Sequence, residues 1–165
     1  MSVTLHTTHG DLKLEIFCEI VPKAAKNFLA LCAMGAYDNT IFHRNIKNFI
    51  VQGGDPTGTG KGGQSIYGGF FEDEIIPTLD HDRRGIVSMA NSGPNTNAAQ
   101  FFISYSKQTH LNGIYTIFAR VIDGFETLDL IEKEPVGKSN KPLNEIKINS
   151  VTIHSNPIAE RESNK

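Results

Sequence analysis

Apolar and polar residues alternate along the first sixteen positions of the chain. Leu12, Leu14 and Ile16 are separated by charged residues, and Val3 and Leu5 show the same spacing of two. Alternation of this kind is typical of a strand with one buried face. The short sequence THG between the two runs suits a tight turn, so the chain is predicted to open with a β-hairpin.

Two stretches change to the three- and four-residue spacing of an amphipathic helix. Pro22 opens the first stretch and Gly35 ends it. The apolar set of this first helix is Val21, Ala25, Phe28, Leu29 and Cys32. A second, shorter helix is expected with Phe125, Leu128 and Ile131 facing inward, and a proline ends it. Both helices are expected to pack one apolar stripe against a sheet.

The remaining apolar runs are short and read as strands. We expect them within residues 42–55, on both sides of a polar loop in residues 85–104, at 117–121 and at 145–154. The apolar set of the last run is Ile146, Ile148, Val151 and Ile153. About eight strands and two helices leave too few helices for alternating βαβ units, so an all-β barrel is favoured.

Composition is that of one ordinary globular domain. The chain has 165 residues, of which 39% are hydrophobic and 21% charged. The formal net charge is -2, and lysine and arginine are scattered rather than clustered. Without a large basic field, direct binding of nucleic acid is disfavoured. We expect residues 1–156 to form the domain and residues 157–165 to form a disordered tail.

Neither a membrane segment nor a metal motif is recognisable in the sequence. The N-terminal residues lack an apolar core, and no run approaches the roughly 18 apolar residues of a membrane span. An intracellular protein is therefore expected. Cys18 and Cys32 lack CxxC spacing and are expected to be free thiols, and the six histidines include no HExxH motif. No metal and no cofactor are predicted.

A glycine-rich segment, TGTGKGGQSIYGG, raises the possibility of a nucleotide site. Gly58, Gly60 and Gly63 formally satisfy GxGxxG, but no helix follows to hold a pyrophosphate. A Walker A motif fails too, because Asp55 replaces its first glycine and Gly62 its Ser or Thr. The segment is interpreted as an ordered surface loop. The charged segment FFEDEIIPTLDHDRRG after it is interpreted as a solvated connection whose charges serve solubility.

Candidate chemistry begins in the stretch FHRNIKNFIVQGGD, residues 42–55. It sets Arg44 among four large apolar residues, and no acidic residue lies close to it in sequence. In an extended run Ile50 and Gln52 share one face and Val51 takes the other. A guanidinium beside an apolar floor suits a polar atom of a ligand. Alternatively, Arg44 is a surface arginine whose stem covers a hydrophobic edge.

A second stretch repeats this combination of amide and apolar side chains. Residues 85–104, GIVSMANSGPNTNAAQFFIS, read as two strands joined by a polar loop. In the outgoing strand Gln100 and Phe102 share one face, while Phe101 and Ile103 share the other. Each of the two stretches therefore pairs a glutamine with an apolar side chain, which favours a ligand site over a bare surface.

Together, the two stretches resemble the cyclophilin family of peptidyl-prolyl cis/trans isomerases. The similarity runs from about Val3 to His154, and MSVTLHTTHGDLKLEIF, NFLALCA, YTIFARVIDGFETLD and VTIHSNP most resemble its single-domain subgroup called peptidyl-prolyl isomerase-like protein three. The resemblance implies a closed eight-stranded antiparallel β-barrel capped by two α-helices. It also implies a site on the outer barrel face, because core side chains fill the interior.

The resemblance further implies which residues form the site. The expected catalytic residues are Arg44, Phe49, Gln52 and Phe102. The expected substrate-binding residues are Ile50, Gly60, Ala90, Asn91, Ser92, Gln100, His110, Leu111 and Tyr115. Arg44 would donate a hydrogen bond to the proline nitrogen as the X-Pro bond rotates. The apolar residues would hold the proline ring, and the amides would hold the peptide on either side.

Three site positions depart from the common family pattern. His110 stands where many members have tryptophan, Tyr115 where they have histidine, and Ile50 where methionine is common. The histidine ring is smaller than an indole and lacks its fixed N–H direction. Weakened binding of cyclosporin is therefore expected, while isomerase activity is less affected.

The expected function is rotation of X-Pro bonds during protein folding or remodelling. The subgroup resemblance implies proline-containing proteins of the spliceosome as partners, and it slightly favours the nucleus over the cytoplasm. A monomer is expected. The alternative is a proline-peptide binding module of a larger assembly whose turnover is incidental. A third interpretation, in which the face of the barrel around Arg44 serves only packing, would leave that arginine without a purpose.

Overall fold

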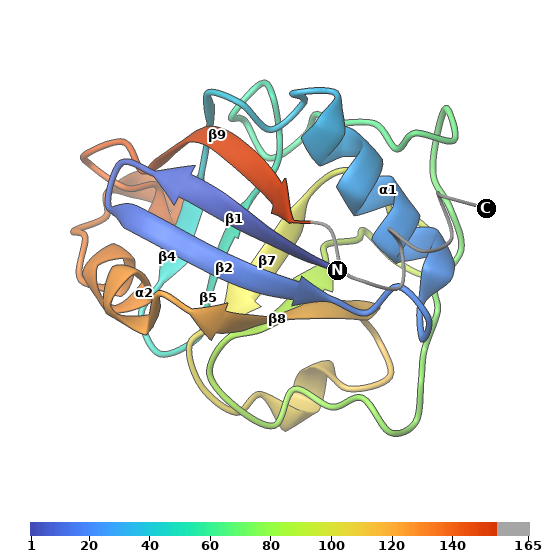
Figure 1. Cartoon of the computed structure of the whole chain (residues 1–165). Coiled ribbons are helices and arrows are strands. Elements are labelled where there is room, and N and C mark those ends of the chain that lie inside the picture. The colour runs from blue at the N-terminus through green and yellow to red at the C-terminus, as the bar shows by residue number, and fades with distance from the viewer. Residues whose placement is uncertain (155–165) are drawn as a thin grey trace.

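The computed structural model describes residues 1–154, which form one curled antiparallel sheet with two α-helices (Figure 1). The strands are β1 (Ser2–Thr7), β2 (Gly10–Ile16), β3 (Thr40–Ile41), β4 (Arg44–Ile46), β5 (Ile50–Gly53), β6 (Ile86–Met89), β7 (Phe101–Ser104), β8 (Ile117–Asp123) and β9 (Lys147–His154). The helices are α1 (Pro22–Ala33) and α2 (Phe125–Glu132), with short 3-10 helices η1 (Thr109–Leu111) and η2 (Lys138–Asn140). The predicted tail, residues 157–165, lies outside the described residues.

The sheet confirms the all-β class with two helices but differs from the expected barrel in detail. It has nine strands rather than eight, in the order β3-β9-β1-β2-β8-β6-β7-β5-β4. The short strands β3 and β4 are its two ends, and no ladder pairs them within residues 1–154. The Phe42 N–H donates to Ile146 O at 2.8 Å and so continues the pairing of β3 with β9. An isolated bridge joins Ile41 in β3 to Asp55, just after β5.

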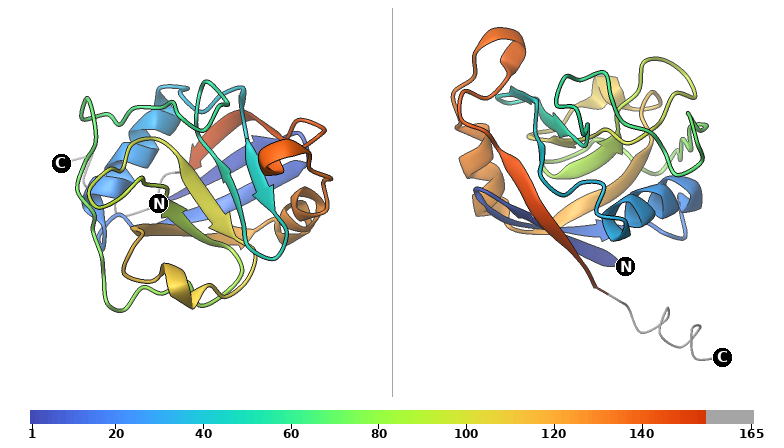
Figure 2. Two further views of the ribbon diagram at one scale, coloured as in Figure 1. Left: turned by 180° about the vertical axis from the view of Figure 1, so that it is seen from behind. Right: turned by 90° about the horizontal axis from the view of Figure 1, so that it is seen from above.

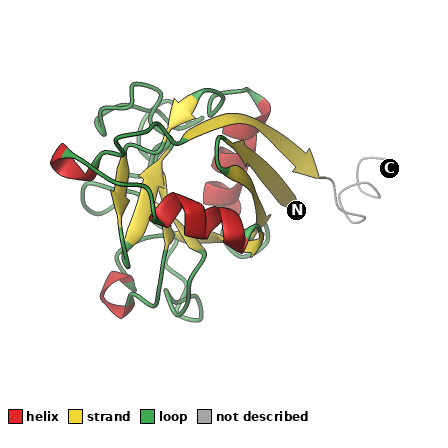
Figure 3. Ribbon diagram, turned by 90° about the vertical axis from the view of Figure 1, so that its left-hand side faces the viewer, coloured by secondary structure: helices red, strands yellow, loops and turns green. Residues whose placement is uncertain are grey.

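The two α-helices lie at opposite ends of the curled sheet, with α2 in front and α1 behind it in Figure 3. Pro22 occupies the first turn of α1, and Gly35, with a φ of 74°, follows the last turn, as the sequence predicts. The apolar stripe of α1, including Ala25, Phe28 and Cys32, is buried in the core. In α2, Leu128 and Ile131 are fully buried. No helix in residues 1–154 has the length and apolar character that crossing a bilayer requires.

Aromatic side chains fill the interior of the sheet. The Phe28 ring lies 4.8 Å from Phe118, 5.2 Å from Tyr37 and 5.4 Å from Phe101 between ring centroids. Large rings in such contact contribute both buried area and favourable edge-to-face geometry. Because the interior is occupied by these side chains, a ligand site has to lie on the outer face, as expected.

The expected inward position of Phe125 is wrong, since 40% of this side chain is exposed. Phe125 is the first residue of α2, at the rim of the sheet, and its ring lies close enough to cover Gly85. The preceding residue, Gly124, has a φ of 95°, and a Cβ there would come within 2.1 Å of Asp11 O. The glycine therefore lets α2 begin directly against the β1–β2 hairpin. Because Phe125 is the first residue of α2, it lies at the rim of the sheet and not inside it.

The apolar positions of β9 change from even to odd numbers between Ile148 and Val151. The register of β1 with β9 shifts at the same place, because Leu5 pairs with Val151 while Thr7 pairs with Ile148. A bulge of one residue reverses which face the following side chains take. The bulge thus keeps both halves of β9 in contact with the core.

The charged segment before β6 does more than keep the protein soluble, so that expectation is wrong. Glu74 Oε1 accepts a hydrogen bond from the Ala24 N–H at 2.7 Å, at the start of α1. His81 is fully buried, with ring nitrogens bonded to Ser88 Oγ and Asn112 Oδ1. Residues 70–84 therefore tie α1 and the loop after η1 to the barrel.

Candidate active site

A small apolar cluster lies on the outer face of β5 and β7, separate from the main core. Ile50, Phe102 and Leu111 are buried in it, and Phe49 and Tyr115 pack against them in part. The neighbouring residues of the same strands, such as Val51 and Phe101, point into the main core. The outer cluster is thus a direct result of strand alternation. Figure 2, left, shows the side of the molecule where β4, β5 and β7 lie.

A cavity of about 240 Å3 opens at this cluster. All of its lining residues belong to the site predicted from the sequence: Arg44, Phe49, Ile50, Gln52, Ala90, Asn91, Phe102, Leu111 and Tyr115. The cavity is smaller than the 300 Å3 or so at the lower limit of drug-sized ligand sites. Its size, and a wall that combines the apolar side chains of Phe49, Ile50, Phe102 and Leu111 with polar groups of Arg44, Gln52 and Asn91, suit a small apolar ring with a polar atom at one edge.

Among residues 1–154, Arg44 is the only cation that lines the cavity. It is the first residue of β4 and pairs with Gln52 in the register of β4 with β5. Within residues 1–154 its side chain forms no ion pair and donates no hydrogen bond, unlike Arg84, whose guanidinium is bound to Asp129 and Glu132. A guanidinium has five N–H donors in a fixed plane. Those of Arg44 are available to a ligand.

A shallower hollow of about 330 Å3 adjoins the cavity and shares Gln52, Ala90 and Asn91 with it. The structure places Gly60, Ser92 and Gln100 here rather than in the cavity itself. The hollow also includes Phe70, Thr96 and Ala98, which the sequence did not single out. Residues on both sides of a proline could therefore be held, one part in each space.

Gln100 already uses its side-chain amide inside the protein. Its Nε2 donates to the carbonyl oxygens of Gly60 at 3.0 Å and Gly62 at 2.9 Å. Its Oε1 accepts from Gln52 Nε2 at 3.0 Å. Gln100 consequently positions the glycine-rich loop and Gln52, which differs from the direct peptide contact that was expected of it.

Asn91 presents backbone groups at the edge of the site. Its side chain is bound within the protein, since Nδ2 donates to Ile114 O at 3.1 Å and Oδ1 accepts from the Gly93 N–H at 3.2 Å. The adjacent Ala90 N–H pairs with Gln100 O at 2.9 Å. The backbone N–H and C=O of Asn91 have no backbone partner in the described chain. A peptide could add to this edge as a strand does.

The glycine-rich loop is folded around the carboxylate of Asp55. This buried carboxylate accepts hydrogen bonds from the backbone N–H groups of Thr57, Thr59, Gly60 and Gly62, at 2.7 to 3.1 Å. Burial favours the neutral acid, but these bonds and the one from the Thr57 hydroxyl outweigh it, and the pKa of Asp55 falls to about 2. The loop is therefore an ordered structure, as expected, with a negative charge at its centre.

Two of the unusual site residues stack on aromatic members of the cluster. The exposed His110 ring lies nearly parallel to Phe49, with centroids 5.7 Å apart and planes at 24°, and it does not line the cavity. Tyr115 meets Phe102 edge to face, with centroids 5.2 Å apart and planes at 90°. His110 therefore acts on the cavity through the Phe49 ring, whereas Tyr115 also lines the cavity itself.

His81 supports the cavity from behind and was missed in the sequence. Its ring lies parallel to that of Phe102, with centroids 6.1 Å apart and planes at 14°. Burial lowers the pKa of His81, although its bond to Asn112 partly opposes this. A lone histidine in a charged segment carries no sequence signal for such a place, because the contact joins distant parts of the chain.

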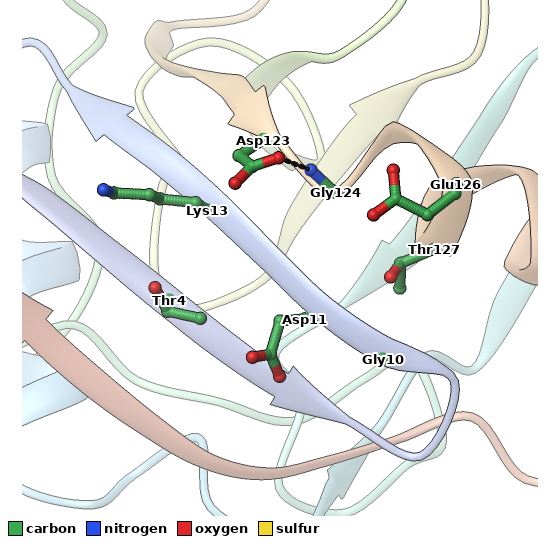
Figure 4. A pocket seen from close by; sticks show the side chains of 8 residues that line it. All are labelled: Thr4, Gly10, Asp11, Lys13, Asp123, Gly124, Glu126 and Thr127. Atoms are coloured by element: carbon green, nitrogen blue, oxygen red, sulfur yellow. Dashed lines mark hydrogen bonds between the residues drawn. The ribbon is translucent and has the colours of Figure 1, made fainter.

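A different kind of hollow lies elsewhere on the surface, between the β1–β2 hairpin and the start of α2 (Figure 4). Its side chains are polar, with the carboxylates Asp11, Asp123 and Glu126, and Lys13 at one end. It has no aromatic floor for a proline ring. In residues 1–154 no group of three or more His, Cys, Asp or Glu side chains is placed to hold a metal ion.

Comparison with known proteins agrees with this geometry. Residues 2–153 match the family model of the cyclophilin type peptidyl-prolyl cis-trans isomerase/CLD. The chain is 67% identical to peptidyl-prolyl cis-trans isomerase CYP18-1 of Arabidopsis thaliana, over 96% of this chain and 99% of that one. It is 62% identical to the human peptidyl-prolyl cis-trans isomerase-like 3, over 97% of this chain and 100% of that one.

A crystal structure of a cyclophilin type isomerase from Cryptosporidium parvum, determined in the presence of the dipeptide Ala-Pro, superimposes on this chain with a TM-score of 0.92. It is 61% identical, and the match covers 94% of this chain and 100% of that one. The subgroup resemblance seen in the sequence is confirmed by the relatives named isomerase-like 3. The chain belongs to the cyclophilin family of peptidyl-prolyl cis/trans isomerases.

Proposed function

We propose that the 240 Å3 cavity is the catalytic site of this isomerase and that Arg44 is its principal catalytic group. The observation that carries the proposal is a guanidinium with no partner among the described residues, set beside an apolar cluster on the wall of a small cavity. Phe49, Phe102 and Leu111 hold the ring and keep water from it.

The chemistry follows from the electronic structure of the amide. Rotation of an X-Pro bond breaks amide resonance, with a barrier of about 18–20 kcal/mol and uncatalysed exchange in tens to hundreds of seconds. In the twisted state the nitrogen has a localised lone pair and the carbonyl oxygen has less negative charge. A donor aimed at that nitrogen binds the transition state more strongly than the ground state. Arg44 supplies such a donor, and the rotation itself requires no nucleophile, base or cofactor.

The energies show that Arg44 does not act alone. Millisecond turnover requires about four decades of acceleration, or about 5.5 kcal/mol. A charge-assisted hydrogen bond contributes about 1.5–3 kcal/mol. The remainder is assigned to exclusion of water by the aromatic wall and to holding the peptide on both sides of the proline. Gln52 and the free backbone edge of Asn91 perform the second task.

Proline-containing segments of proteins are the proposed substrates. The C. parvum relative was crystallised in the presence of Ala-Pro, which supports a proline peptide as the ligand of the matching site in this chain. Residues before or after the proline would occupy the adjoining hollow that contains Gly60 and Ser92. Its exposed Phe70 offers an apolar contact to one of them.

For the cellular role we propose remodelling of spliceosomal proteins in the nucleus, by a monomer. The support is the similarity to the isomerase-like 3 subgroup, and no feature of the composition contributes to it. Co-purification of the tagged protein from nuclear and cytoplasmic fractions tests this role. Recovery from the cytoplasmic fraction alone, without splicing components, contradicts it.

The catalytic proposal is tested by NMR exchange spectroscopy on an X-Pro peptide with wild type, Arg44→Ala and Arg44→Lys. We expect Arg44→Ala to reduce kcat by at least tenfold, with a smaller change in peptide affinity. Arg44→Lys keeps the charge but loses the planar donors, so it should recover little activity. The matched control is Arg120→Ala, which removes an exposed arginine paired with Glu15 outside the site.

Equal losses of turnover and affinity in Arg44→Ala contradict a transition-state role. A wild-type protein that binds the peptide without accelerating exchange favours the alternative, a proline-peptide binding module of a larger assembly. His110 and Tyr115 are then the first residues to examine, since they differ from the common family pattern.

A further inference from the structure

A large basic hollow adjoins the candidate catalytic cavity on another side of Arg44. It has a volume of about 710 Å3 and lies between β4, the glycine-rich loop and η2. Arg44 and Gln52 line both spaces. In Figure 2, left, η2 lies beside β4 at the edge of the sheet. A bound peptide that passes Arg44 therefore enters this hollow without leaving the protein surface.

Three cations face the hollow. Arg44, Lys138 and Lys141 line it, no acidic side chain does, and none of the three forms an ion pair within the described residues. The Asp55 carboxylate is buried beneath this wall and bound to the backbone N–H groups of Gly60 and Gly62. With three cations against one carboxylate, and His43 neutral, the net charge is +2.

His43 contributes a neutral polar group to the wall of the hollow. It lines the hollow, and its Nδ1 is buried without a hydrogen-bond partner among the described residues. Its pKa is lowered first by burial and further by the charges of Arg44 and Lys141, against an opposing effect of Asp55. His43 therefore adds an unpartnered polar atom to a wall on which no acidic side chain lies.

The two lysines are held on one short turn. The Gly137 N–H donates to Lys141 O at 2.8 Å, and Val136 and Pro142 form a bridge at its base. Within the turn Ser139 and Asn140 have left-handed backbone, with φ of 58° and 59°. A closed turn fixes the backbone from which both ammonium groups extend, so less freedom is lost when they bind a common anion.

We infer that this basic hollow binds an oxyanion of the substrate protein, a side-chain carboxylate or a phosphate, close in sequence to the proline. The inference rests on the proposed function, since Arg44 is the shared wall of both spaces. An extended peptide advances about 3.3 Å per residue, so an anion two or three residues from the proline reaches the hollow. The site would then prefer prolines that have an acidic or phosphorylated neighbour.

Peptides that differ at one position test this preference. One set has Ala, Glu, phosphoserine or Lys two residues after the proline, and a second set has them two residues before it. We expect Glu to bind about fivefold more tightly than Ala at low ionic strength in one of the sets, because exposed charge pairs each change affinity a few-fold. Phosphoserine should gain more, Lys should lose, and added salt should reduce the differences.

Two double variants test whether the lysines of the hollow cause the preference for an acidic neighbour. Lys138→Ala with Lys141→Ala should bring the Glu-to-Ala affinity ratio to about one. Lys13→Ala with Lys26→Ala removes the same charge away from the hollow and should keep the wild-type ratio. Wild-type Glu-to-Ala and phosphoserine-to-Ala affinity ratios that are both one in both sets overturn the inference, and so does a ratio that survives the Lys138 and Lys141 changes.

The same peptides distinguish between the two candidate ligands, a carboxylate and a phosphate. A gain with phosphoserine but not with Glu assigns the hollow to phosphorylated partners, whereas gains with both residues assign it to acidic side chains in general. If the proposed isomerase function is wrong, the protein does not accelerate exchange even in the alanine peptide. That result differs from failure of the anion inference, in which exchange is accelerated but an acidic neighbour brings no gain in affinity. Binding and exchange are therefore measured on the same samples.

Discussion

Gln52 and Gln100 are joined side chain to side chain, with Gln52 Nε2 donating to Gln100 Oε1 at 3.0 Å. Gln100 in turn donates to the carbonyl oxygens of Gly60 and Gly62. One series of hydrogen bonds thus runs from the wall of the proline cavity to the glycine-rich loop. The position of this loop beside the site depends on a residue that need not touch the substrate.

Gln100→Leu should therefore impair substrate binding more than chemistry. Loss of neutral hydrogen bonds worth about 1 kcal/mol predicts a KM about fivefold higher with a smaller change in kcat. Steady-state kinetics on a proline peptide measures both. Gln64→Leu is the matched control, because Gln64 is exposed in the same loop. An unchanged KM in Gln100→Leu would mean that Asp55 alone positions the loop.

Asp55 predicts a specific loss of stability in acid. Its pKa is lowered to about 2 in the folded protein, against about 3.9 for an unperturbed Asp. A lowered folded-state pKa stabilises the protein above the unfolded value, and this contribution is lost as pH falls from about 4 through 2. Linkage gives about 2 kcal/mol, measurable by urea unfolding monitored by circular dichroism at pH 6, 4 and 2.5.

Asp55→Asn is the companion variant. The amide has one acceptor oxygen where the carboxylate has two, and its N–H2 would face the N–H groups of Gly60 and Gly62. We expect a loss of about 2 kcal/mol at pH 6 and a flatter stability profile below pH 4. Asp80→Asn, at an exposed aspartate outside the glycine-rich loop, is the control. Equal acid sensitivity of wild type and Asp55→Asn would contradict this assignment.

Local pattern in the sequence predicted most of the fold and much of the site. Strand alternation correctly put Ile50, Gln52 and Phe102 on the outer face and Val51 in the core. The family resemblance supplied Leu111 and Tyr115, which come from other segments yet line the same cavity. Contacts between distant segments could not be read from local pattern. The nine-strand order, the burial of His81 and the basic hollow at η2 are of this kind.

Glu74 illustrates such a distant contact and makes a testable prediction. The first residues of α1 have no side-chain cap of their own, and Glu74 accepts the N–H groups of Ala24 at 2.7 Å and Lys23 at 3.3 Å. A carboxylate at a helix N-terminus accepts hydrogen bonds from N–H groups that have no partner within the helix, and its negative charge interacts favourably with the positive end of the helix dipole. Glu74→Ala should therefore lower the free energy of unfolding by about 1 kcal/mol, as removal of an N-cap does.

Urea unfolding of Glu74→Ala, Glu74→Gln and Glu145→Ala checks this role. Glu74→Gln keeps one acceptor without the charge and should lose about half as much. Glu145 is exposed and begins no helix, so its removal should have little effect. A stability of Glu74→Ala equal to that of Glu145→Ala would show that solvent caps α1 equally well.

His110 is predicted to limit cyclosporin binding. It stacks on Phe49 beside the cavity, at the position where many family members have tryptophan. An indole would extend this wall and present a fixed N–H donor to the ligand, which the smaller imidazole does not. His110→Trp should therefore increase cyclosporin affinity by at least about tenfold, the value of one additional hydrogen bond with some apolar contact. Isothermal titration calorimetry measures this change directly.

His110→Ala separates the gain of an indole from the loss of the imidazole. If the imidazole only lacks favourable contacts, His110→Ala binds cyclosporin no better than wild type, and the gain is specific to tryptophan. If His110→Ala also binds more tightly, the stacked imidazole obstructs the ligand. An unchanged cyclosporin affinity in His110→Trp would mean that Ile50 or Tyr115, which line the cavity itself, limits cyclosporin binding instead. Ile50→Met and Tyr115→His then identify which wall excludes the ligand.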